Sequence, residues 1–123
     1  MAERETLSEE LETARRLVDL LEQDGFRLDF AVWAKDDEED GRLYLVPRDR
    51  EETKLKQTIR VATTISTHKD ELPGRHDLRY SIVTPNDPVI RAVRSATPIA
   101  GKVRGIYRQG TYIDTAYVFR SAA

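Results

Sequence analysis

The sequence predicts a single α+β domain: a mainly antiparallel sheet of five strands with three helices, in the chain order α-β-β-α-β-α-β-β. Three observations predict this class. Apolar residues recur three and four positions apart near the N-terminus, they alternate with polar residues in later segments, and turn residues separate these segments without a linker or repeat. A chain of 123 residues can bury one continuous core but is short for two ordinary domains, so we expect one domain over residues 1–123.

The first helix is predicted between Thr6 and Gly25. Thr6 is the expected N-cap, Glu9 lies three residues on as in a capping box, and Gly25 supplies a left-handed stop. The apolar stripe of this helix contains Leu7, Leu11, Ala14, Leu17, Val18 and Leu21.

Two strands are predicted next, at residues 26–35 and 42–47, joined by the acidic turn at residues 36–41. Alternation in the first strand indicates one buried face and places Trp33 on the second face. Pro47 closes the second strand because it has no N–H to donate. The buried face is expected to contain Phe26, Leu28, Phe30, Val32 and Ala34.

A second helix is predicted within residues 50–67, where Leu55, Ile59, Ala62 and Ile65 recur at helical spacing. A third strand is predicted at residues 78–84. Asp87 is then the expected N-cap of a short third helix that has Pro88 at its first position and extends to about Ala96.

The C-terminal stretch GIYRQGTYIDTAYVFR predicts a hairpin over residues 105–120. With a two-residue turn at Gln109-Gly110, arginines share the buried face with apolar residues. With the three-residue loop Gln109-Gly110-Thr111, the arginines lie on the opposite face, so we predict the longer loop. The face predicted to be buried contains Val103, Tyr107, Ile113, Tyr117 and Phe119. The face predicted to meet water contains Arg104, Arg108, Tyr112, Asp114 and Arg120, with Ile106 and Val118 as apolar exceptions.

Charge is divided unevenly along the chain. Residues 1–53 hold 17 Asp and Glu against 8 Lys and Arg, whereas residues 54–123 hold 5 against 12, giving net charges of -9 and +7. This asymmetry is compatible with two halves that face each other, with a basic part that binds an anionic partner, or with a mixed solvated surface. The absence of cysteine, of a secretory signal and of a membrane-spanning run predicts a soluble cytoplasmic protein with no membrane association.

Two stretches, TPNDPVIRAVRSA and GIYRQGTYIDTAYVFR, resemble segments of a family of short bacterial proteins of no known activity. In that family an Asp-Pro helix start precedes a hairpin that ends in an Ala-Tyr-hydrophobic-aromatic-Arg run, here residues 116–120. The initial helix and hairpin are also similar. The resemblance implies a shared fold and transfers no functional residue.

Two sets of residues have types that occur in metal sites. His68, Asp70, Glu71, His76 and Asp77 lie within ten residues, but in a Pro-Gly loop whose spacing matches no helical ligand pair. Glu52-Thr53-Lys54 has the Glu-x-Lys form of metal-dependent nucleases, but it falls at a helix start, where acidic residues favour the dipole. We therefore predict no catalytic residue, no metal site and no cofactor.

The sequence favours a non-enzymatic protein-interaction module that binds an acidic partner, or a second copy of itself, through an arginine- and tyrosine-bearing sheet face. The alternatives are a nucleic-acid-binding accessory protein and, third, a metal-dependent hydrolase built on Glu52, Lys54 or the loop at residues 68–77. The predicted binding residues are Arg104, Arg108, Tyr112 and Arg120, followed by Arg91 and Arg94, which share a helical face.

Overall fold

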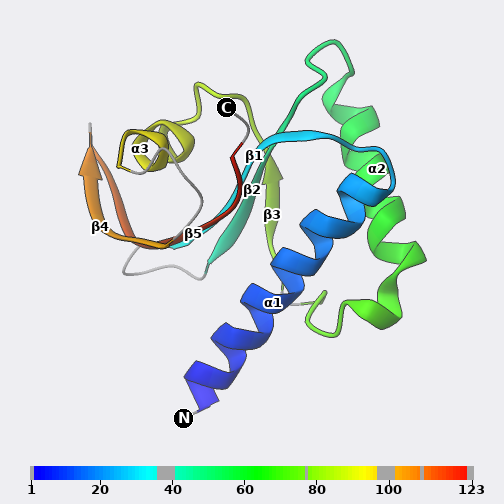
Figure 1. Cartoon of the computed structure of the whole chain (residues 1–123), viewed down its shortest axis with the longest axis horizontal. Helices are drawn as coiled ribbons and strands as arrows, with labels where there is room; N and C mark the ends of the chain where they lie inside the picture. The colour runs from blue at the N-terminus through cyan, green and yellow to red at the C-terminus, as the bar shows by residue number, and fades with distance from the viewer. Residues whose placement is uncertain (1, 36–40, 77, 97–101, 109, 122–123) are drawn as a thin grey trace. The chain divides into compact units, whose positions relative to one another are not determined.

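The structure is a computed structural model that describes residues 2–35, 41–76, 78–96, 102–108 and 110–121, without the side chains of residues 2–8, 103, 104, 106 and 108. The predicted α+β class is confirmed, with three α-helices within the described residues. The elements are α1 (Ala2–Gln23), β1 (Leu28–Lys35), β2 (Arg42–Pro47), α2 (Lys54–Thr67), a 3-10 helix η1 (Lys69–Glu71), β3 (Tyr80–Ile82), α3 (Pro88–Ala96), β4 (Lys102–Arg108) and β5 (Thr111–Ser121) (Figure 1).

The chain divides into two compact units, each made of two separate segments. A helical unit comprises residues 1–27 and 49–78, and a sheet unit comprises residues 28–48 and 79–123. The helical unit contains α1, α2 and η1, whereas the sheet unit contains all five described strands and α3. The expectation of one domain over residues 1–123 stays a prediction.

The predicted C-terminal stop of α1 is confirmed. Gly25 has a φ of 87° and donates its N–H to the Glu22 carbonyl, while Phe26 donates to the Leu21 carbonyl at 2.8 Å. This pair of bonds is a Schellman motif, in which only glycine adopts the left-handed position without strain. The predicted N-cap at Thr6 is wrong, because α1 begins at Ala2 and continues through Thr6.

The apolar spacing of α2 predicts the helix but not the face that is buried. Gln57, Val61 and Thr64 are the buried positions, whereas Leu55 and Ile59 are exposed. The two polar members are satisfied, since Gln57 donates to the Asp49 carbonyl at 3.0 Å and Thr64 donates to Asp24 Oδ2 at 2.9 Å. Specific hydrogen bonds therefore outweigh apolar spacing in setting the orientation of this helix.

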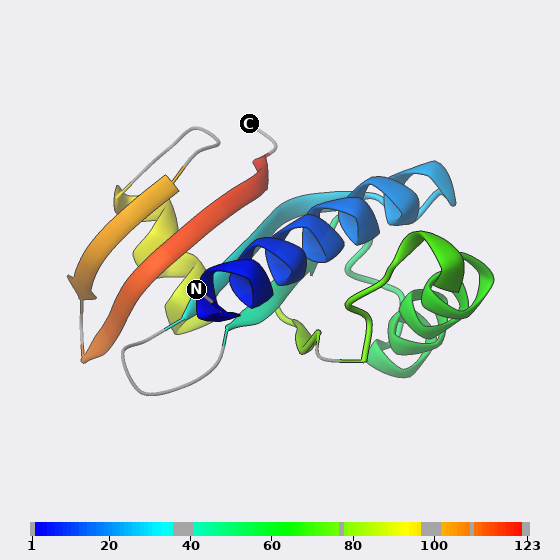
Figure 2. The same ribbon diagram turned by 90° about the horizontal axis from the view of Figure 1, so that it is seen from below.

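The sheet has the strand order β3-β2-β1-β5-β4 (Figures 1 and 2). β1 is antiparallel to both β2 and β5, and β4 is antiparallel to β5. β3 runs parallel to β2, so the sheet is mixed. Figure 2 shows β4 along the outer side of β5, with α3 beside them.

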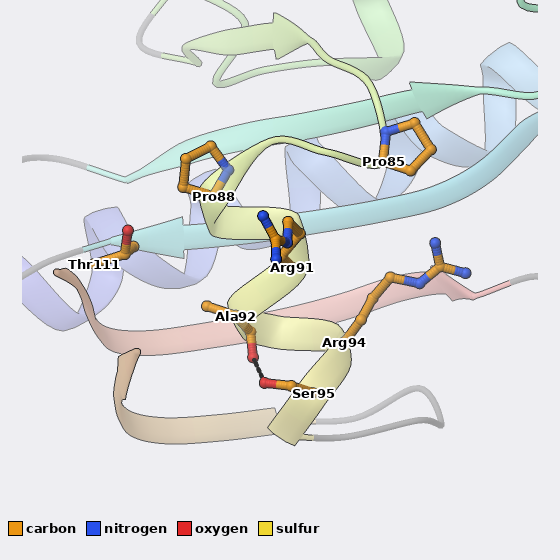
Figure 3. Close-up of a pocket in the computed structure, with 7 residues that line it drawn as sticks. All are labelled: Pro85, Pro88, Arg91, Ala92, Arg94, Ser95 and Thr111. Carbon is orange, nitrogen blue, oxygen red and sulfur yellow. Dashed lines mark hydrogen bonds between the residues drawn. The ribbon is translucent and has the colours of Figure 1, made fainter. Parts of the chain in front are cut away.

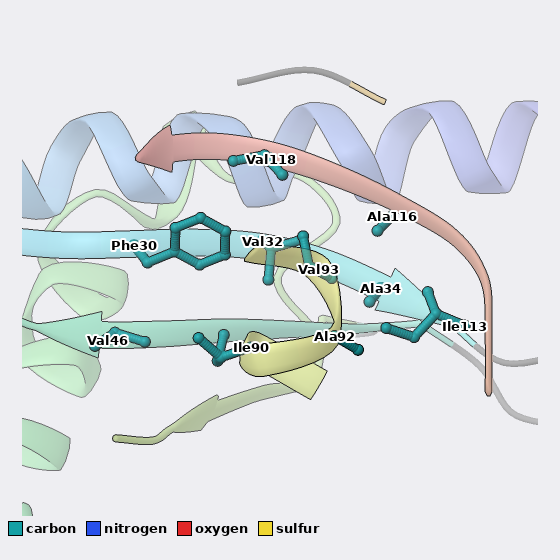
Figure 4. Packing of buried hydrophobic residues seen from close by; sticks show 10 residues of the cluster. All are labelled: Phe30, Val32, Ala34, Val46, Ile90, Ala92, Val93, Ile113, Ala116 and Val118. Carbon is teal, nitrogen blue, oxygen red and sulfur yellow. The ribbon is translucent and has the colours of Figure 1, made fainter. Parts of the chain in front are cut away.

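β1 is buried on both faces, so the prediction of one buried face is wrong. Phe30, Val32 and Ala34 belong to an apolar cluster with α3 (Figure 4), and the alternate residues Ala31 and Trp33 are also buried. One face packs against α3, and on the other face the Trp33 ring lies 6.1 Å from the ring of Tyr117 on the neighbouring β5. The cluster contains Phe30, Val32, Ala34, Val46, Ile90, Ala92, Val93, Ile113, Ala116 and Val118.

The three-residue loop predicted for the C-terminal hairpin is wrong. Arg108 pairs with Thr111, so two residues join the strands, and the Arg104–Thr115 and Ile106–Ile113 pairs keep the same register. Gly110 has the left-handed φ of 81° that such turns require, while Gln109 lies outside the described residues.

The predicted faces of β5 change accordingly. Val118, predicted on the face that meets water, is buried and pairs with Val32. Phe119, predicted to be buried, lies at a β-bulge and is half-buried. Tyr107, also predicted to be buried, is 71% exposed. The pairing with β1 overrides the local pattern because it turns Ala116 and Val118 toward α3. Tyr117 lies on the other side, with its ring centroid 6.1 Å from that of Trp33.

Gly41→Ala is expected to destabilise the protein by about 1–3 kcal/mol, because a Cβ at this buried position overlaps the six-membered ring of Trp33. Urea denaturation followed by circular dichroism measures the loss. The variant Trp33→Phe removes part of the obstructing ring, so the effect of Gly41→Ala should be smaller in that background. Equal losses in both backgrounds contradict this account.

Candidate functional site

α3 positions the two arginines that the sequence predicts on one helical face. Asp87 caps the helix, since its Oδ1 accepts from the Val89 N–H at 2.9 Å, and Pro88 is the first helical residue. Ile90 and Val93 are fully buried against the sheet, which leaves Arg91 and Arg94 on the exposed side of α3. The Arg94 guanidinium also lies 5.3 Å from the centroid of the Phe30 ring, a cation–π distance.

These arginines border a hollow of about 410 Å³. Figure 3 shows Arg91, Arg94 and Ser95 projecting from α3, with the Arg94 side chain extending away from Thr111 of β5. The Ser95 hydroxyl donates to the Ala92 carbonyl at 2.8 Å. The lining residues are Pro85, Pro88, Arg91, Ala92, Arg94, Ser95 and Thr111.

A second hollow, of about 280 Å³, adjoins the first. Thr111 borders both hollows. Pro88 borders the first and its neighbour Val89 borders the second, so the two hollows meet at the first turn of α3. The second is lined by Ala34, Lys35, Arg42, Tyr44, Arg79, Val89, Gly110, Thr111, Tyr112 and Ile113.

Five cationic residues border the two hollows, and we call this set the cationic surface: Lys35, Arg42, Arg79, Arg91 and Arg94. Arg42 is held in place, because its Nη1 donates to Ser81 Oγ at 2.9 Å and to the Tyr80 carbonyl at 3.3 Å. Among the described residues, no carboxylate forms an ion pair with Lys35, Arg42, Arg91 or Arg94. The acidic residues 36–40, which follow Lys35 in the sequence, lie outside the described part of the chain.

The structure brings together some of the predicted binding residues. Tyr112 lines the second hollow and lies opposite Tyr107 in the hairpin. Thr111 also borders the hollow that Arg91 and Arg94 line. Arg120 is exposed at the far end of β5, where it pairs with Ala31 and borders neither hollow.

Arg104 and Arg108 are described by their backbones alone. They pair with Thr115 and Thr111 respectively, and their side chains lie outside the described part of the chain.

Sequence reasoning missed Lys35, Arg42 and Arg79 as members of the site. Lys35 ends β1 and Arg42 begins β2, so the two residues flank the acidic stretch in the sequence. The hairpin predicted from residues 26–35 and 42–47 already places Lys35 and Arg42 side by side. Their proximity to α3 depends on strand pairing with β5, which local sequence does not reveal.

Three of the residues considered for a metal site, His68, Glu71 and Glu52, have other partners. His68 Nδ1 lies 2.8 Å from Glu71 Oε2, Glu71 also accepts from Arg16, and Glu52 forms an ion pair with Arg60 at 3.0 Å. Asp77 lies outside the described residues. In the described ranges no three His, Asp or Glu residues are arranged to hold a metal ion.

Comparisons with protein-family models, with curated proteins and with solved structures find no match for this chain. The resemblance to short bacterial proteins therefore stays a prediction. Over the described residues, no helix has both the length and the apolar character required to cross a membrane.

Asp87→Ala is expected to destabilise the protein by about 1 kcal/mol, because the Val89 N–H loses its capping acceptor. Asp87→Asn retains a capping oxygen and should recover most of this loss. Thermal and urea denaturation of both variants test the assignment, and an equal loss for Asn and Ala contradicts it.

Glu71→Gln is expected to lower the free energy of unfolding more at about pH 7 than at about pH 3. The hydrogen bond from Arg16, followed by that from His68, holds the pKa of Glu71 below its ordinary value of 4.5. A carboxyl with a lowered pKa stabilises the fold above its ordinary pKa, and this contribution disappears as pH falls through the lowered value.

Urea denaturation at both pH values measures the difference. Glu51→Gln is the matched control, because Glu51 is exposed and its carboxylate has no ion pair among the described residues. A Glu71→Gln effect that persists unchanged in acid contradicts the assignment.

Proposed function

We propose that this chain is a small, non-enzymatic protein-interaction module of the cytoplasm, and that its cationic surface binds an acidic segment of a partner protein. The observation that carries this proposal is the presence of five cationic residues around two adjoining hollows. The cytoplasmic location is supported by the absence of cysteine.

The charge around the surface supports an anionic partner. Residues 79–123 contain seven Lys and Arg against two Asp, and the two carboxylates already have local donors. Asp87 caps α3, and Asp114 accepts from the Thr115 hydroxyl at 3.1 Å. An incoming carboxylate therefore meets guanidinium groups, whose planar fork binds both carboxylate oxygens.

An acidic protein segment is favoured over nucleic acid by the charge that flanks the second hollow. The sequence between Lys35 and Arg42 contains five consecutive Asp and Glu residues. A nucleic acid carries a phosphate at every nucleotide, so a strand that leaves the hollow toward this turn is repelled. A peptide with a few carboxylates separated by neutral residues avoids this repulsion.

Nucleic-acid binding is the second candidate, and one observation favours it. Tyr107 and Tyr112, which are paired across the hairpin, are 71% and 39% exposed. Exposed aromatic rings beside cationic side chains are the arrangement with which proteins stack unpaired bases. Arg104, Arg108 and Arg120 stay predicted contacts for either partner.

Metal-dependent hydrolysis, the third hypothesis, has no supporting contact among the described residues. Glu52 forms an ion pair with Arg60, and Glu71 binds Arg16 and His68.

Arg91→Glu/Arg94→Glu is expected to weaken binding of a fluorescent ten-residue Gly-Ser peptide with three separated Glu residues by at least about tenfold at low salt, because two attractive charges become repulsive. Fluorescence anisotropy measures the dissociation constant. The control Arg27→Glu/Lys69→Glu changes the net charge equally at exposed positions of the helical unit and should leave binding within about twofold.

A single-stranded oligonucleotide of equal length serves as the second probe. Tighter binding of the oligonucleotide, with a loss in Tyr107→Ala and a steep salt dependence, selects the nucleic-acid function instead. Equal loss of peptide binding in both charge-reversal variants, or no binding at low salt, overturns the proposal.

A further inference from the structure

β4 lies at one edge of the sheet. It pairs with β5 on one side, and among the described residues no strand pairs with its other side (Figure 2). In an antiparallel pair, alternate residues direct their N–H and C=O groups away from the neighbouring strand. The seven residues of β4 therefore present a row of main-chain groups to a further strand, whereas β3 at the opposite edge has only three residues.

The charged residues of β4 are all cationic. The strand contains Lys102, Arg104 and Arg108 and no Asp or Glu. These residues are two and four positions apart, which is a multiple of the two-residue repeat of a strand. Acidic residues at alternate positions of an added strand can therefore face the cations, and directly facing pairs of opposite charge stabilise a sheet.

The same charges disfavour a second copy of the chain at this edge. When two β4 strands pair antiparallel about Gly105, Lys102 of each strand lies opposite Arg108 of the other. Like charges that face each other directly destabilise a sheet. Nucleic acid has no main-chain amides with which to continue the ladder. An extended protein segment with carboxylates at alternate positions satisfies both the main chain and the charges.

We infer that β4 binds an extended acidic segment of a partner protein by strand addition, with Glu or Asp at alternate positions and β-branched residues between them. Tyr107 stands at one of the intervening positions and is 71% exposed, so it offers a ring against which a β-branched residue of the added strand packs. The inference rests on the proposed function, because it takes the same acidic class of partner. It adds that the partner binds through its main chain.

Amide hydrogen exchange followed by NMR tests the strand addition. The probe is the peptide Thr-Glu-Val-Glu-Val-Glu-Thr. When the peptide saturates the protein, the N–H groups of alternate β4 residues that do not bond to β5 should exchange at least about tenfold more slowly, because they become donors to the peptide. The Gly-Ser peptide with three separated Glu residues has the same charge but low strand propensity, so it should bind at least about fivefold more weakly.

Arg104→Glu/Arg108→Glu is expected to weaken binding of the alternating peptide by at least about tenfold, because facing pairs of opposite charge become pairs of like charge. The control Arg27→Glu/Lys69→Glu makes the same change in net charge at exposed positions of the helical unit and should leave the dissociation constant within about twofold.

The outcomes separate this inference from the proposed function. Unchanged exchange throughout β4 with the peptide bound overturns strand addition, while a loss of binding in Arg91→Glu/Arg94→Glu still supports the cationic surface. Slowed exchange in β4, with binding unaffected by Arg91→Glu/Arg94→Glu, supports strand addition and overturns the cationic surface. Failure of the alternating peptide to bind also overturns strand addition, and the Gly-Ser peptide then tests the proposed function by itself.

Discussion

The antiparallel pairing of β5 with β1 is the constraint on which the rest of the sheet unit depends. It makes β1 the central strand and leaves β4 at the edge. It also turns Ala116 and Val118 toward α3, while Tyr117 packs against Trp33 on the opposite face. The same pairing sets the position of the first residues of β5, so that Thr111 lies between the two hollows that α3 borders.

The cationic surface follows from how α3 packs. A helix of nine residues buries Ile90 and Val93 at helical spacing, and the residues that immediately follow each of them, Arg91 and Arg94, are left outside. The aliphatic portion of Arg94 crosses toward Phe30, so the same residue contributes to packing and to charge. The short helix α3 thus contributes both to the apolar packing of the sheet unit and to its positive charge. Arg91 and Arg94 lie on its exposed side, so neither requires a buried partner.

Local signals in the sequence predicted the elements better than their faces. β2 and α3 have the expected bounds, because Pro47, Asp87 and Pro88 act on the backbone of their own segment. The hairpin register, both buried faces of β1 and the orientation of α2 depend on residues far away in the chain. For the same reason, the sequence places Arg91 and Arg94 on one helical face, but it does not predict that Lys35, Arg42 and Arg79 line a common hollow. A wrong face in a correctly placed helix or strand is the typical error when pairing partners are unknown.

The division of each unit into two separate segments determines the order in which the chain can fold as it is synthesised. The helical unit needs residues up to 78, all of which precede α3 and the C-terminal hairpin. β1 and β2 are made early but wait for β5, since Phe30 pairs with Ser121 near the end of the chain. Contacts of such long sequence separation form slowly, because closing the intervening loop costs chain entropy. On the ribosome the helical unit therefore has all its segments first, and the apolar first hairpin stays without its β5 neighbour until residue 121 has been made.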